Sequence, residues 1–178
     1  MMNINAIGRA LVLVTGLAVW WPAGAAENVL LHGALVAEPC TLHPGDEAVV
    51  LEFGTVIDKY LYLNGRTHSK AFTLRLQDCD ISLGNTVKIS FSGTESAELP
   101  GLLKLDGASQ ASGVAIGIET AAGVPLPLNS ASGSYPLSAG NSALTLQAYV
   151  QAEPTAITNK SISRGAFSAV TTFNLVYE

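Results

Sequence analysis

Apolar and polar residues alternate along most of the chain after residue 40, in short runs separated by turn-forming residues. A period of two places apolar side chains on one face of a strand and polar side chains on the other. One buried face and one solvated face are typical of antiparallel sheets. The pattern therefore predicts a series of short strands. The alternating runs lie at residues 49–53, 72–77, 87–92, 114–119, 144–151 and 167–177.

The segments between these runs are rich in glycine, asparagine, proline and serine, which favour turns. Residues 154–163 are expected to form a loop, because Pro154 prevents the preceding strand from continuing. No stretch of a dozen residues shows the 3.6-residue apolar period of a long helix. Regularly spaced short strands without a dividing linker predict one domain with an immunoglobulin-type β-sandwich.

The first 25 residues have the features of a secretory signal peptide. Arg9 supplies a positive charge, residues 10–21 are almost entirely apolar, and Ala23-Gly24-Ala25 places small residues at the expected cleavage positions. A membrane anchor is the alternative, but the apolar run is shorter than the roughly 20 residues that span a bilayer. We expect cleavage after Ala25 and export of the remaining chain.

Composition and charge exclude several classes of protein. The chain is 48% hydrophobic and 13% charged, which excludes a disordered chain. Its net charge of -5 argues against binding to nucleic acid. Its two cysteines are too few for a four-thiolate zinc site or an iron–sulfur centre. Export favours a Cys40–Cys79 disulfide, worth about 4 kcal/mol on chain-entropy grounds, over two unpaired buried thiols.

No arrangement of residues in the sequence supports catalysis. His32, His43 and His68 lie far apart, and none has the spacing of a metal-binding motif. The sequence contains no G-x-S-x-G nucleophile motif. Asp78 and Asp80 flank a cysteine and lack the glycine-centred spacing of a calcium loop. We therefore expect no enzyme activity, no metal site and no cofactor.

The two ends of the mature chain are the most informative segments. Near the N-terminus, Val29, Leu31 and Leu35 fall on one face of an extended segment, and Gly33 lies on that face between two leucines. A glycine within a strand often marks the close approach of another backbone. The chain ends within its longest alternating run, at Glu178. An ordinary first strand and an ordinary last strand explain this periodicity equally well.

Taken together, these features resemble the subunits of chaperone–usher pili, the type 1 and P fimbrial family. The short N-terminal arm and the segment Leu99-Pro100-Gly101 are most similar to the small adaptor subunits of the P pilus tip. The resemblance covers essentially the whole mature chain. It is carried by Val29, Leu31, Gly33, Leu35, Pro39-Cys40-Thr41, residues 72–79, Phe91-Ser92-Gly93-Thr94, residues 113–118, Ala148-Tyr149-Val150, Gly165, Phe173, Leu175 and Tyr177.

The resemblance implies an all-β pilin fold, which is an immunoglobulin-like sandwich that lacks its last strand. It implies a signal peptide at 1–25, a donor-strand extension at 26–38 and a pilin domain at 39–178. A periplasmic chaperone and then the arm of a neighbouring subunit would fill the missing position, and an outer-membrane usher would carry the subunit to the surface pilus. The implied donor residues are Val29, Leu31, Gly33 and Leu35, and the implied groove residues are Gly165, Phe173, Leu175, Tyr177 and Glu178.

Other functions remain open from the residues alone. Within a fibre, the chain could be an adaptor, a major pilin or a terminating subunit, whereas a tip adhesin would need a second domain for which the chain is too short. Outside a fibre, a secreted monomeric β-sandwich that binds a carbohydrate or a peptide has the same strand pattern. An exported hydrolase is the weakest alternative, because it has no nucleophile and base in the sequence.

Overall fold

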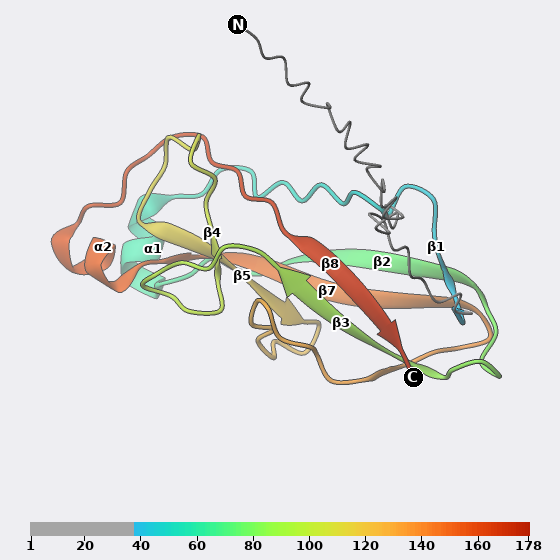
Figure 1. Cartoon of the computed structure of the whole chain (residues 1–178). Coiled ribbons are helices and arrows are strands. Elements are labelled where there is room, and N and C mark those ends of the chain that lie inside the picture. Colours follow the sequence, from blue (N-terminus) through green and yellow to red (C-terminus); the bar gives the residue numbers. More distant parts are fainter. Residues whose placement is uncertain (1–37) are drawn as a thin grey trace, which may run out of the picture. The chain divides into compact units, whose positions relative to one another are not determined.

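The computed structural model describes residues 38–178 (Figure 1). The predicted signal peptide at 1–25 and the predicted donor residues Val29, Leu31, Gly33 and Leu35 lie outside this range. The described part of the chain is mostly strand, with two short helices. In chain order the elements are β1 (Thr41–Leu42), α1 (Asp58–Asn64), β2 (Lys70–Cys79), β3 (Thr86–Ser92), β4 (Leu103–Lys104), β5 (Val114–Thr120), β6 (Tyr135–Pro136), β7 (Gly140–Ala152), α2 (Pro154–Asn159) and β8 (Thr172–Tyr177).

The strands form two antiparallel sheets. The larger has the order β1-β2-β7-β5-β4, and the smaller has the order β6-β3-β8. Side chains that alternate along the strands are buried between the sheets, as the period of two requires. Leu74 and Leu146 from the larger sheet and Ile89 from the smaller sheet are each no more than 1% exposed. The core confirms the predicted immunoglobulin-like β-sandwich and the strands predicted around 72–77, 87–92, 114–119 and 144–151.

Two of the strand predictions are wrong, one entirely and one over part of its length. Residues 49–53 belong to no strand of the described chain, and the last strand begins at Thr172 instead of Phe167. In both segments alternate residues still contact the core, since Leu51, Phe53 and Phe167 pack against it. Alternation reports which face of a segment is buried, whereas a strand also needs a hydrogen-bonded neighbour. The described chain provides no neighbouring strand at these two places.

The loop predicted at 154–163 is also partly wrong, because α2 begins at Pro154 and ends at Asn159. Proline is favoured in the first turn of a helix, where its missing N–H has no intrahelical partner in any case. The helix α1 was not predicted from the sequence, and the reason is its length. With seven residues and one buried side chain, Leu61, it is too short to display a helical period.

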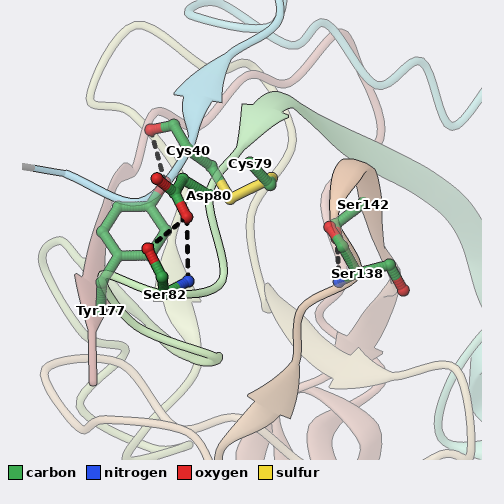
Figure 2. Close-up of a disulfide and its surroundings, with 7 residues drawn as sticks. All are labelled: Cys40, Cys79, Asp80, Ser82, Ser138, Ser142 and Tyr177. Atoms are coloured by element: carbon green, nitrogen blue, oxygen red, sulfur yellow. Dashed lines mark hydrogen bonds between the residues drawn. A yellow bond between two sulfur atoms is a disulfide. The ribbon is translucent and has the colours of Figure 1, made fainter.

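The cysteines form the predicted disulfide between Cys40 and Cys79 (Figure 2). Both are buried, and the bond fixes the start of the described chain to the end of β2. The backbone N–H of Asp80 donates to the carbonyl of Pro39 at 2.7 Å. The hydroxyl of Tyr177 lies 3.4 Å from the carbonyl oxygen of Cys40. The point where residues 26–38 would join the domain is therefore held beside the C-terminal end of β8.

Candidate binding groove

A long apolar groove runs between two segments that lie outside the strands, and the start of β8 extends the second segment. One wall is residues 47–54, and the other is residues 165–171 with Phe173. The volume of the groove is about 800 Å³. Its floor consists of hydrophobic core residues from both sheets, and all of them except Phe72 are buried. The floor residues are Phe72, Leu74, Phe91, Leu103, Ile116, Ile118 and Ala148.

The strand β8 lies at the edge of its sheet. It pairs with β3, and no strand within residues 38–178 pairs with its other side. The inward side chains of β3, Val87, Ile89 and Phe91, are at most 4% exposed. Their cross-strand partners on β8 face the same core but are only partly buried. This difference across one strand pair shows where the sandwich is open. The partly buried partners are Tyr177, Leu175 and Phe173.

The wall at 47–54 also has backbone groups without backbone partners. No backbone–backbone hydrogen bond joins residues 47–56 to another part of the described chain. In Figure 1 the long segment between β1 and α1 carries no arrow. An edge with free N–H and C=O groups is a template for an added strand. The groove thus offers an apolar floor between two unpaired backbone edges.

Asp46 fixes the wall at 47–54 where that wall begins. Asp46 is 5% exposed, and its carboxylate accepts three hydrogen bonds from Arg75, one from the backbone N–H at 2.8 Å and two from the guanidinium at 2.6 and 3.0 Å. These bonds, those from the side chain above all, lower the pKa of Asp46 to about 2. Further along, the ammonium of Lys70 donates to the carbonyl oxygen of Glu52. Side chains of β2 therefore hold this wall in place.

We expect the stability of the fold to depend on the charge of Asp46 at acid pH. Its folded pKa of about 2 lies below the usual value of about 3.9. Its contribution is therefore complete above about pH 5 and is lost progressively as the pH falls through 4 toward 2. Asp46→Asn should lower the melting temperature at pH 6 and reduce its fall between pH 4 and pH 2. Thermal unfolding of the folded chain at several pH values measures both effects.

Glu52→Gln is the matched control, because Glu52 is exposed on the same wall and its side chain has no partner among the described residues. Other carboxylates with lowered pKa values contribute to the acid dependence of both variants, so the difference between the two variants isolates Asp46. Equal melting temperatures for Asp46→Asn and the unmodified chain at every pH would contradict the assigned role.

Gly165 lies at the end of the groove that is next to α1. It also lines a smaller pocket of about 150 Å³, together with Leu61 and Phe167. The φ angle of Gly165 is +148°, and a Cβ atom there would lie 2.5 Å from the Cβ of Gln110. Only glycine fits such a close approach. The backbone of residues 166–168 is hydrogen-bonded to the loop at 106–111, which leaves its other edge facing the groove.

The C-terminal residue is bound by its own domain. The backbone oxygen of Glu178 accepts hydrogen bonds from the N–H groups of Asn85 and Thr86 at 3.0 and 3.1 Å. Its side chain forms an ion pair with Lys88 at 2.6 Å. The structure therefore places Gly165 and Phe173 on the groove, Leu175 and Tyr177 further along the inner face of β8, and Glu178 at the end of that strand.

A second ion pair with a buried carboxylate lies away from the groove. The guanidinium of Arg66 binds both carboxylate oxygens of Glu119 at 3.0 and 3.1 Å and stacks on the ring of Tyr149. Arg66 lowers the pKa of Glu119, which also accepts a hydrogen bond from Ser69. The ring of Tyr149 lies against Gly117, where a Cβ atom would be 2.2 Å from it. The Glu119 carboxylate is bound by Arg66 and Ser69 of the same domain, so we assign this cluster to the scaffold.

Within residues 38–178, no three histidine, cysteine, aspartate or glutamate side chains lie close enough to hold a metal ion. No helix in that range is long and apolar enough to span a bilayer.

The sequence and structure were compared with known proteins. A family model described as "Fimbrial protein" matches residues 29–178. The chain is 32% identical to the Fimbria A protein of Serratia marcescens, over 99% of this chain and 100% of that protein. It is 32% identical to the fimbrial adapter PapK of Escherichia coli, over 85% of this chain and 88% of that protein. The crystal structure of the P pilus rod subunit PapA matches with a TM-score of 0.69 at 25% identity, over 79% of this chain and 100% of that one.

Proposed function

Because the chain belongs to the fimbrial protein family, we propose that it is polymerised by donor-strand exchange and contributes to cell adhesion as part of the fibre. The family and the matched proteins make it a structural fimbrial subunit and not an enzyme. Fimbrial subunits form pili at the cell surface. The observation that carries the proposal is the groove, whose β8 side chains face the core but are only partly buried.

In this proposal the residues at 26–38 leave the domain as a donor arm and enter the groove of a neighbouring subunit. Val29, Leu31 and Leu35 would insert their side chains, and the arm backbone would pair with the free edge of β8. Burying three such side chains contributes roughly 5–9 kcal/mol before ordering costs. That gain is comparable to the stability of a whole domain, so the polymer would be durable without covalent bonds.

The open groove also implies two assembly partners. An exposed apolar cleft with an unpaired strand edge aggregates unless it is covered. A periplasmic pilus chaperone would cover it with a strand of its own, and basic residues of the chaperone would bind the terminal carboxylate at Glu178. An outer-membrane usher would then receive the complex. The signal peptide at 1–25 would deliver the chain to that compartment.

Two positions in the fibre are supported by different observations. The resemblance of the arm and of Leu99-Pro100-Gly101 to tip adaptors, together with the match to the adapter PapK, favours a minor adaptor subunit. The match to the rod subunit PapA favours a repeated subunit. The number of copies in purified fibres distinguishes the two.

The proposal is tested by expressing the mature chain in the periplasm with and without a pilus chaperone. We expect aggregation or degradation of the chain alone, and a soluble one-to-one complex when the chaperone is present. Co-purification and size-exclusion chromatography measure this outcome. A soluble, folded monomer obtained without any chaperone would contradict the proposal and would favour a secreted carbohydrate- or peptide-binding module.

A further inference from the structure

We infer that the domain has two complementary ends, and that the acidic end of one copy contacts the basic end of a second copy in the fibre. The contact lies outside the groove. The inference rests on the proposed function, because it takes the chain to be polymerised through its arm. We call residues 38–42 with 78–85 the disulfide end, and residues 57–64 with 158–165 the helical end.

The two ends lie far apart in the domain, and β7 runs between them. Gly140 at the start of β7 pairs with Cys79 of the disulfide end. The N–H of Ala152, the last residue of β7, donates to the carbonyl of Gly65 directly after α1 at 2.8 Å. The 13 residues of β7, at about 3.3 Å each, separate the ends by about 40 Å. Figure 1 shows both helices at one end of the strands and β1 at the other.

The helical end is held together by side chains. The backbone N–H of Ile162 donates to the hydroxyl of Tyr62 at 3.1 Å. The guanidinium of Arg164 forms an ion pair with Asp58 at 2.6 Å. Residues 158–165 therefore lie beside α1 and form one surface with it.

The disulfide end is acidic. Glu38, Asp78 and Asp80 are exposed, and the two segments of this end contain no lysine, arginine or histidine. Hydrogen bonds from the side chain and the backbone of Ser82 lower the pKa of Asp80, which keeps that carboxylate charged. Three carboxylates without a cation give this end a formal charge of -3.

The helical end has the opposite charge. Lys59, Lys160 and Arg164 are exposed, and the one carboxylate of this end, Asp58, is bound by Arg164. The ammonium groups of Lys59 and Lys160 form no ion pair with any residue in the range 38–178. Three cations and one carboxylate give a formal charge of +2. The charges of the two ends are therefore complementary.

Both ends also expose large apolar side chains. At the disulfide end Ile81 and Leu83 are 46% and 56% exposed, and at the helical end Ile57 and Leu63 are 59% and 85% exposed. A single exposed apolar residue is ordinary. Two on each end, beside charges of opposite sign, match the apolar centre and polar rim of a protein interface.

Symmetry decides which ends meet. Contact between two disulfide ends would bring like charges together, and it would be complete after two copies. Contact between unlike ends is repeated in every copy and extends a fibre. Exposed ion pairs are weak on their own. The arm joins two copies covalently to one non-covalent assembly and so raises the effective concentration of one end at the other.

Carbodiimide treatment of purified fibres tests the contact. The reagent joins a lysine amine to a carboxylate that touches it, with loss of water and without a spacer. We expect covalent multimers on denaturing gels, and any link between the two ends must join two copies, because β7 separates the ends of one copy. Mass spectrometry should find peptides that link Lys59 or Lys160 to Glu38, Asp78 or Asp80.

The ion pair between Lys88 and Glu178 within each copy reports that the reaction has worked. Fibres in which this pair is linked and the two ends are not would overturn the contact. The same end-to-end links in the chaperone-bound subunit, where copies are not joined, would overturn it as a contact of the fibre. Links from the helical end only to a different subunit would overturn the second copy as partner.

Exchanging the charges tests the complementarity. Lys59→Glu with Lys160→Glu should reduce end-to-end links about tenfold or more, because two ion pairs are replaced by repulsion. Adding Glu38→Lys with Asp78→Lys should restore the links, with amine and carboxylate exchanged between the ends. Lys104→Gln, which lies outside both ends, should leave the links unchanged. No recovery in the fourfold variant, at normal incorporation into fibres, would overturn the proposal.

Failure of this inference differs from failure of the proposed function. Fibres that contain normal amounts of the chain without end-to-end links would overturn the contact and leave donor-strand exchange intact. Incorporation of a chain that lacks residues 26–36 would overturn donor-strand exchange itself. Immunoblotting of the fibres used for cross-linking measures incorporation alongside the links.

Discussion

A chain that lacks residues 26–36 is expected to bind its chaperone normally and to be absent from surface fibres. Its groove is complete, because every lining residue lies after position 46, so the chaperone can still cover it. It has no arm to place in a neighbour. The lost burial of roughly 5–9 kcal/mol corresponds to a fall in incorporation of three orders of magnitude or more. Quantitative immunoblotting of purified fibres and of the periplasm measures the two pools.

A full-length control separates the loss of apolar side chains from the loss of chain length. Replacing Val29, Leu31 and Leu35 together with serine keeps the backbone and should reduce incorporation nearly as much as the deletion. Replacing His32 and Ala34 with serine changes the other face of the arm and should leave incorporation close to that of the unmodified chain. Normal fibres from the deleted chain would refute the donor role.

The strands that the sequence predicted correctly are those with a neighbour on at least one side and a buried inner face. The run that became β3 alternates strictly because Val87, Ile89 and Phe91 face the core, and the strand pairs with β8 along its whole length. The run at 49–53 alternates for the same reason, since Leu51 and Phe53 contact the core. It still forms no strand. Periodicity detects burial, and it carries no information about a neighbour that another molecule supplies.

The same limit explains why the groove could not be derived from residue patterns. The two walls are more than a hundred residues apart in the sequence, and the resemblance to a family was needed to suggest a missing strand. The disulfide could be predicted from the composition, because an exported chain with two cysteines has only one possible pairing. The ion pair of Asp46 with Arg75 could not be predicted, because the two residues are 29 positions apart and no local sequence pattern links them.

The two walls of the groove are held in place by other parts of the domain. Asp46 and Lys70 anchor the wall at 47–54 through side chains, and the loop at 106–111 anchors the segment at 166–168. Both walls therefore hold their positions without pairing to each other. The proposed donor-strand exchange depends on these anchors, because they leave the floor of the groove uncovered between the two walls.

Phe173→Asp is expected to abolish stable assembly, and it probes the groove from the acceptor side. The side chain faces the core and lines the groove, so a donor arm would bury the new carboxylate against apolar residues. An unpaired buried charge costs about 3 kcal/mol or more, which weakens the donor complex at least a hundredfold. Fibres containing the variant should dissociate at lower guanidinium concentrations, or should not form.

Asn174→Asp adds the same charge one residue further along β8, on its exposed face. It should leave fibre formation and the guanidinium midpoint unchanged, because its carboxylate stays in water. Phe173→Leu keeps an apolar side chain at the groove and should give an intermediate midpoint. Equal dissociation of Phe173→Asp and Asn174→Asp fibres would mean that no strand covers the inner face of β8, and the account of the groove as an acceptor site would be wrong.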